Sequence, residues 1–147
     1  MRLQQITAIA IVAACLSPSV GWAQETQVEL GEDEFLDNCA VCHGVSGKGD
    51  GPLGVTMRDF HGTLVADLTM LSANNGGAFP FERVLDVIDG RAEVAIHGPR
   101  EMPVWGQEFK SEASPNLSPT IQELLVRGRI LALIEYLRDL QVFDGGQ

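Results

Sequence analysis

The amino-acid sequence predicts an all-α domain with long loops. Apolar residues between 126 and 137 keep helical spacing, and no stretch alternates convincingly between apolar and polar residues as a strand would. A proline and a glycine bracket a second helical segment at 80–89. The chain is long enough for one domain with one hydrophobic core, and we find no internal repeat.

Residues 1–23 have the features of a signal peptide. Arg2 precedes an apolar run, and small residues ending at Ala23 form a cleavage site. The apolar run is too short for a comfortable membrane span, so no transmembrane span is expected in the mature chain. Cleavage after Ala23 would place the protein in the bacterial periplasm. An alternative is lipoprotein processing at Cys15, which would leave a lipid anchor on that residue.

The next segments follow from charge and glycine content. Residues 24–30 are expected to form a flexible lead-in to a single domain at 31–147. A helix is expected from about 31 to 41, because three acids near its start suit the positive end of a helix dipole. The stretch 44–66 is rich in glycine and lacks periodicity, so it is expected to be loop. A short helical turn is expected at 67–72.

The second half of the chain is more clearly helical. The helix at 80–89 is expected to be followed by a short helical piece at 93–97. The last helix is expected over 119–140, with Ser118 as its N-cap. Gly128 interrupts the apolar pattern of that helix, and could mark a break or a close approach of another backbone.

The segment Cys39-Ala40-Val41-Cys42-His43 reads C-x-x-C-H, the attachment site for c-type haem. Residues three apart share one helical face, so both sulfurs can reach one edge of the porphyrin while His43 meets the iron. A dithiol redox site usually lies in a βαβ context, which is not seen here. A structural zinc site requires four Cys or His ligands in two spaced pairs. The motif therefore implies electron transfer, ligand binding or redox catalysis at haem iron.

Met102 is the favoured second iron ligand. Its thioether would raise the reduction potential, and Pro103 excludes regular helix at that point. His97 is the main rival, because imidazole is also a good iron ligand. Trp105 is expected to form a wall of the haem pocket, with its indole N–H directed to a propionate. The remaining candidates are Met57, Met70 and His61.

These residues resemble those of the class I cytochromes c, the small bacterial monohaem type, over roughly 31–140. The resemblance rests on the haem motif, on Gly31 and Phe35 before it, and on Met-Pro-x-Trp-Gly at 102–106. It implies the cytochrome c fold, with about three to five helices wrapped around one covalently bound haem. The long polar stretch at 107–118 departs from the family pattern and is expected to be a surface loop.

The resemblance also implies particular contacts. Gly31 and Phe35 should pack against the C-terminal helix at Leu133 and Tyr136. The carbonyl of Pro52 should accept a hydrogen bond from the second ring nitrogen of the histidine ligand, which would fix the ring and raise its basicity.

We therefore expect a one-electron carrier of the periplasm, without enzymatic activity of its own. One haem c would be held by Cys39 and Cys42, and its iron by His43 and Met102. The formal net charge of −10 disfavours nucleic acid and favours redox protein partners with a basic docking surface, although acidity would equally keep an exported protein soluble. One alternative is a haem c subunit or accessory protein of a periplasmic oxidoreductase complex. Another is a five-coordinate haem that senses or transforms a small gas.

Overall fold

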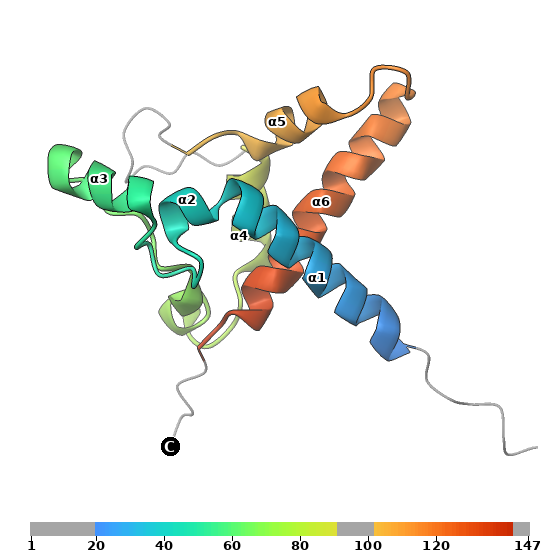
Figure 1. Ribbon diagram of the computed structural model, residues 1–147. Coiled ribbons are helices and arrows are strands. Elements are labelled where there is room, and N and C mark those ends of the chain that lie inside the picture. The colour runs from blue at the N-terminus through green and yellow to red at the C-terminus, as the bar shows by residue number, and fades with distance from the viewer. Residues whose placement is uncertain (1–19, 91–101, 143–147) are drawn as a thin grey trace, which may run out of the picture.

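The computed structural model describes residues 20–90 and 102–142, with side chains described from residue 26 onward. Within these ranges the chain forms α-helices and two 3-10 turns, and no strand (Figure 1). The elements are α1 (Val20–Asn38), α2 (Ala40–His43), α3 (Pro52–His61), η1 (Leu68–Met70), η2 (Ala73–Asn75), α4 (Phe81–Asp89), α5 (Trp105–Glu112) and α6 (Pro119–Asp139). The expected all-α fold is confirmed. Among the described helices, none is long and apolar enough to cross a membrane.

The two longest helices, α1 and α6, cross each other and form the centre of the structure (Figure 1). At the crossing, a Cβ atom on Gly31 would overlap the backbone carbonyl of Ala132, so only glycine allows this approach. Phe35 is fully buried, and its ring centroid lies 5.3 Å from that of Tyr136. Leu133 is buried in the same cluster. The expected packing of Gly31 and Phe35 on the last helix is confirmed.

The last helix follows its sequence signals closely. The Ser118 hydroxyl accepts a hydrogen bond from the N–H of Ile121, and a proline occupies the first turn. Gly128 lies inside an unbroken α6, with nothing within 4 Å of the place where a Cβ would stand. It marks neither a break nor a close contact in the structure.

The first helix begins earlier than expected. Since α1 starts at Val20, residues 24–30 are helical and not a flexible lead-in, and the three acids near 31 lie in mid-helix. Val28 explains part of this difference, because its side chain packs against the buried core. Helices gain most of their stability from such tertiary packing, which local charge does not reveal.

Two more helices lie in stretches expected to be loop. Inside 44–66, α3 spans Pro52–His61, and the next residue, Gly62, ends the helix in the left-handed region with a φ of 67°. Because glycines lie at both ends of α3, the sequence of this stretch indicates a loop although it contains a helix. Inside 107–118, the end of α5 is helical because Phe109 is almost completely buried.

The remaining elements match their signals. The helix α4 ends at Asp89, followed by Gly90 with a φ of 82°, and η1 forms within the expected turn at 67–72. The helical piece expected at 93–97 lies outside the described residues.

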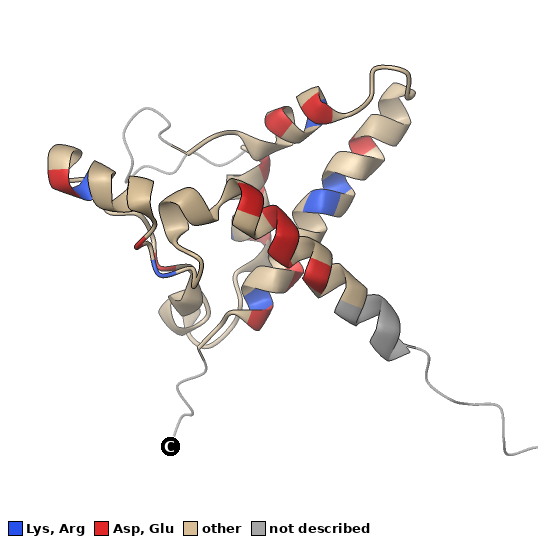
Figure 2. Ribbon diagram, viewed as in Figure 1, with Lys and Arg blue, Asp and Glu red and all other residues tan. Residues whose placement is uncertain are grey.

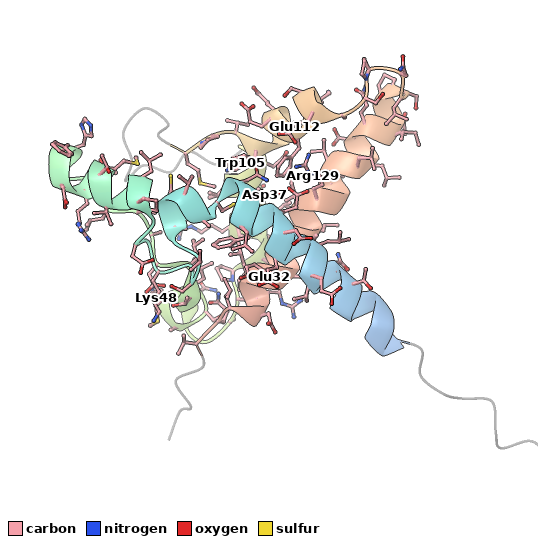
Figure 3. The ribbon with its side chains drawn as sticks, in the orientation of Figure 1. Glu32, Asp37, Lys48, Trp105, Glu112 and Arg129 are labelled. Carbon is pink, nitrogen blue, oxygen red and sulfur yellow. The ribbon has the colours of Figure 1, made fainter. Side chains whose placement is uncertain are left out.

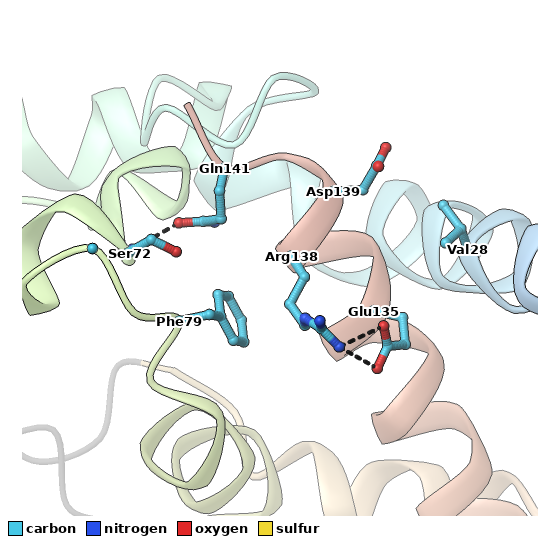
Figure 4. Close-up of a pocket in the computed structure, with 8 residues that line it drawn as sticks. Val28, Ser72, Phe79, Glu135, Arg138, Asp139 and Gln141 are labelled. Carbon is cyan, nitrogen blue, oxygen red and sulfur yellow. Dashed lines mark hydrogen bonds and ion pairs between the residues drawn. The ribbon is translucent and has the colours of Figure 1, made fainter. Parts of the chain in front are cut away.

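Gln141 ties the end of α6 to the segment around η1. Its Oε1 accepts the N–H of Ser72 at 2.8 Å, and its Nε2 donates to the carbonyl of Leu68 at 2.8 Å. Figure 4 shows this corner beside a surface groove that Val28 and Phe79 help to line. These hydrogen bonds hold the segment around η1 against the end of α6.

The helix crossing predicts opposite effects for two glycine substitutions. Gly31→Ala should lower the free energy of unfolding by about 2 kcal/mol, because the new methyl group meets the Ala132 carbonyl. Gly128→Ala should raise it by about 0.5–1 kcal/mol, because the space is open and alanine favours helix. Urea denaturation of the haem-loaded protein measures both. Equal effects of the two variants would contradict the close crossing.

The buried tyrosine predicts a loss of stability at high pH. Burial, then the charges of Glu32 and Asp139, raises the pKa of Tyr136 above that of a free phenol. The folded protein thus keeps a proton that the unfolded chain releases, so this stability is complete below about pH 10 and decreases above it. Tyr136 is the only tyrosine, so its ultraviolet titration is unambiguous. In Tyr136→Phe this pH dependence should disappear, and a titration at or below pH 10 in the native protein would contradict the burial.

Candidate functional site

The C-x-x-C-H motif forms a single helical turn at the end of α1. Cys39 is the N-cap of α2, and its carbonyl accepts hydrogen bonds from the N–H groups of Cys42 and His43 at 3.1 and 2.9 Å. Both cysteines are free thiols of intermediate exposure. Two thiols and one imidazole are therefore presented from one turn.

The thiols are poorly suited to dithiol redox chemistry. Burial, followed by the charge of Glu34 and the neighbouring Cys42, raises the pKa of Cys39 to about 12. Burial also raises the pKa of Cys42. Reactive dithiols require a lowered pKa, because the thiolate is the nucleophile. Neither thiol therefore has the lowered pKa that a dithiol redox site requires.

The His43 ring is oriented by a backbone carbonyl. Its Nδ1 lies 3.0 Å from the carbonyl oxygen of Ala66. A histidine that binds a metal through Nε2 commonly donates its Nδ1–H in this way, which fixes the ring and raises its basicity.

The resemblance implied that the Pro52 carbonyl would accept this hydrogen bond from His43, and that prediction is wrong, because the carbonyl of Ala66 takes this place. Pro52 is the first residue of α3, and its carbonyl accepts the hydroxyl of Thr56 at 2.9 Å within that helix. Residue identity does not point directly to Ala66, since any residue supplies a backbone carbonyl. The Asp67-x-Thr69 pattern directly after it was the available signal, because it is typical of a capped turn.

The turn after Ala66 holds its carbonyl in place. The carboxylate of Asp67 accepts the backbone N–H of Thr69 at 2.9 Å and its hydroxyl at 2.6 Å. The N–H of Leu68 donates to the carbonyl of Gly47 at 2.7 Å. The segment that orients His43 is thereby tied to the loop that follows the motif.

The glycine-rich loop also covers the carbonyl end of α2. The N–H of Gly49 donates to the carbonyl of His43 at 2.7 Å, and the N–H of Gly51 to that of Cys42 at 3.2 Å. A Cβ on Gly51 would crowd the backbone of α2, so glycine lets α3 begin directly against the motif. The loop at 44–51 thus has a structural task at this site.

Met102 lies just before α5, and Trp105 is the first residue of that helix. Both side chains are partly buried, and they pack against the same hydrophobic cluster as Cys39. Residues 103–104 are not helical, as the proline predicted, and α5 begins at Trp105. A Cβ on Gly90 would overlap the Val104 side chain, so the end of α4 supports this segment closely.

The other candidate ligands are less well placed or not described. His61 is exposed at the end of α3, while Met57 and Met70 are of intermediate exposure on α3 and η1. His97 and Cys15 lie outside the described residues. In the parts of the chain that the structure describes, no three His, Cys, Asp or Glu side chains form a metal-binding group.

The donor set and its surroundings fit a haem. The two cysteine thiols of the motif can form thioether bonds to a haem, and the His43 imidazole is oriented by a carbonyl. Met102, before α5, offers the thioether of its own side chain. Partly buried apolar side chains pack around the same cluster and supply the apolar environment that a porphyrin requires. These include Leu68, Leu71, Phe81 and Leu85.

The fold and the site define a protein that carries covalent haem on a helical turn. The chain matches the Cytochrome c family over residues 28–141, and it belongs to that family. Members of this family bind haem c covalently and transfer electrons, so this is a haem-dependent electron-transfer protein. No curated protein and no solved structure matched the chain. The bound haem supplies a one-electron ferric–ferrous couple.

The carbonyl of Ala66 predicts a change in reduction potential. Asp67→Ala should loosen the turn that holds this carbonyl, weaken its hydrogen bond to His43 and make the imidazole a poorer donor. The potential should rise by a few tens of millivolts, where about 59 mV is a tenfold change for one electron.

Asp59→Ala is the matched control, since it removes the same charge from an exposed ion pair with Arg58 on α3. A redox titration measures both variants. Equal shifts would show that charge alone, and not the orientation of His43, is responsible.

Proposed function

We propose that this protein is a periplasmic carrier of single electrons with one haem, whose iron is bound by His43 and Met102. The observation that supports this most is the turn that presents Cys39, Cys42 and His43, with the histidine oriented through Nδ1. The sequence contains three cysteines, and Cys15 lies in the leader, so the remaining pair suffices for one haem.

His43 and Met102 would together occupy both axial positions. A filled coordination shell excludes small molecules and stays alike in both oxidation states, which lowers the reorganisation that accompanies electron transfer. The thioether of Met102 favours ferrous iron and raises the potential. Trp105, one turn before the buried Phe109, would form a wall of the pocket, with its N–H available to a propionate.

The periplasmic location rests on the leader and on the chemistry of attachment. Residues 1–23 carry the charge, the apolar run and the small-residue site of an exported protein. Attachment of haem to a C-x-x-C-H motif occurs outside the cytoplasm, which agrees with export. The alternative is lipid attachment at Cys15. A mature chain that begins at Cys15 would indicate this alternative.

The charge distribution supports a partner with a basic docking surface. Exposed acids follow one another along α1, directly before the attachment turn, as Figure 2 shows. They are Glu29, Glu32, Asp33 and Asp37. The adjoining α2 carries no Asp, Glu, Lys or Arg. A small uncharged contact flanked by acids would give a weak complex that forms quickly and is sensitive to salt.

A second function is a permanent subunit of a periplasmic oxidoreductase. An apolar stripe on α6 favours it, because Ile121, Leu124, Leu125 and Leu131 share one exposed helical face. A free carrier would elute as a monomer from periplasm of its native source, whereas a subunit would elute with the large complex. Size-exclusion chromatography, followed by haem absorbance, separates the two functions.

Replacing Met102 tests the proposed ligand set. In Met102→Ala the thioether-to-iron band at the red end of the ferric spectrum should disappear, and the ferrous form should bind carbon monoxide rapidly. The reduction potential should fall by on the order of 0.1 V or more, because axial ligands set haem potentials over a wide range.

Met57→Ala and Met70→Ala are matched controls, which should keep the band and the potential. An unchanged Met102→Ala spectrum would overturn the choice of ligand. A native protein without the band, which binds carbon monoxide rapidly, would favour the gas-binding alternative.

A further inference from the structure

Arg129 joins three helices in one cluster of charges. It lies in the middle of α6, and its Nε and Nη2 donate to the two carboxylate oxygens of Glu34 on α1 at 2.6 and 2.8 Å. Its Nη1 donates to Glu112 on α5 at 2.7 Å. Figure 3 shows Arg129 and Glu112 where α5 lies against α6. The pair with Glu34 is bidentate and mostly shielded from water, the strong form of this interaction.

The guanidinium of Arg129 also stacks on an aromatic ring of α5, the helix that follows Met102. Its central carbon lies 3.8 Å from the ring centroid of Phe109, a cation–π contact. The Phe109 ring is 5.7 Å from that of Trp105, the first residue of α5. Met102 precedes Trp105 by three residues. Arg129 therefore contacts α5 at both Phe109 and Glu112.

On its other side, the cluster reaches the attachment turn. Asn38 donates its side-chain N–H to both the carbonyl and a carboxylate oxygen of Glu34, each at 3.1 Å. Asn38 is the last residue of α1, directly before Cys39. One guanidinium thus connects the segment that bears the thiols with the segment that bears Met102.

We propose that Arg129 is a positioning residue that keeps Met102 seated on the iron. The inference rests on the proposed ligation by His43 and Met102. Loss of Arg129 removes the ion pairs with Glu34 and Glu112, and it removes the cation–π contact with Phe109. The Met102 segment then opens more often, although the iron ligand itself is untouched.

Imidazole binding to the ferric, haem-loaded protein tests this role, because imidazole binds only when Met102 has left the iron. Arg129→Gln should bind imidazole at least about tenfold more tightly, since charge-assisted hydrogen bonds to a half-buried partner are lost. Arg129→Lys should show most of this effect, because lysine cannot make the bidentate pair or stack on Phe109 in the same way.

Arg127→Gln is the matched control. Arg127 lies two residues earlier on α6, is more exposed than Arg129 and forms an ion pair with Glu123, one turn before it on the same helix. It should bind imidazole like the native protein. If Arg129→Gln does not fold, Glu112→Gln is the second variant, because it cuts the tie to α5 alone and should tighten binding by about threefold.

Thermal unfolding separates a positioning role from general stability. A lower melting temperature with unchanged imidazole affinity in the Arg129 and Glu112 variants would overturn the proposal, even if the native protein shows the thioether band. A native protein without that band would instead overturn the ligation itself and, with it, this role of Arg129.

Discussion

The crossing of α1 and α6 at Gly31 is the contact on which the rest of the structure depends. Because two backbones meet there without a side chain between them, the position of α1 on α6 is closely defined. The attachment turn begins one residue after α1 ends, so the crossing also places Cys39. On α6, the same crossing places Arg129 against α1 and α5. The α1–α6 pair thus positions both the attachment turn and the segment that bears Met102.

Features with a local signal could be predicted from the sequence. The turn formed by Cys39 and His43 follows from residue spacing, and the start of α6 follows from the Ser118 cap and the proline after it. The packing of Gly31 and Phe35 was implied by resemblance, and the structure explains it through backbone contact and burial. In each case a few neighbouring residues carry the information that specifies the geometry.

Features that depend on distant residues could not be predicted. Helix α5 depends on the burial of one ring, that of Phe109, which makes a cation–π contact with Arg129 of α6. The early start of α1 depends on the packing of Val28 against the core. The partner of His43 is a backbone carbonyl, at Ala66, and a carbonyl leaves no trace in residue identity. The sequence therefore predicts candidate ligands more readily than it predicts the groups that orient them.

We propose above all that a single macrocycle is bonded to the turn at the end of α1. Intact mass of the mature protein, produced in cells that attach haem, tests it most directly, together with the mass of the peptide that holds Cys39 and Cys42. We expect a chain that begins at Gln24 and carries the mass of one haem on that peptide. Colourless protein with no added mass, or a haem released by denaturation, would contradict it.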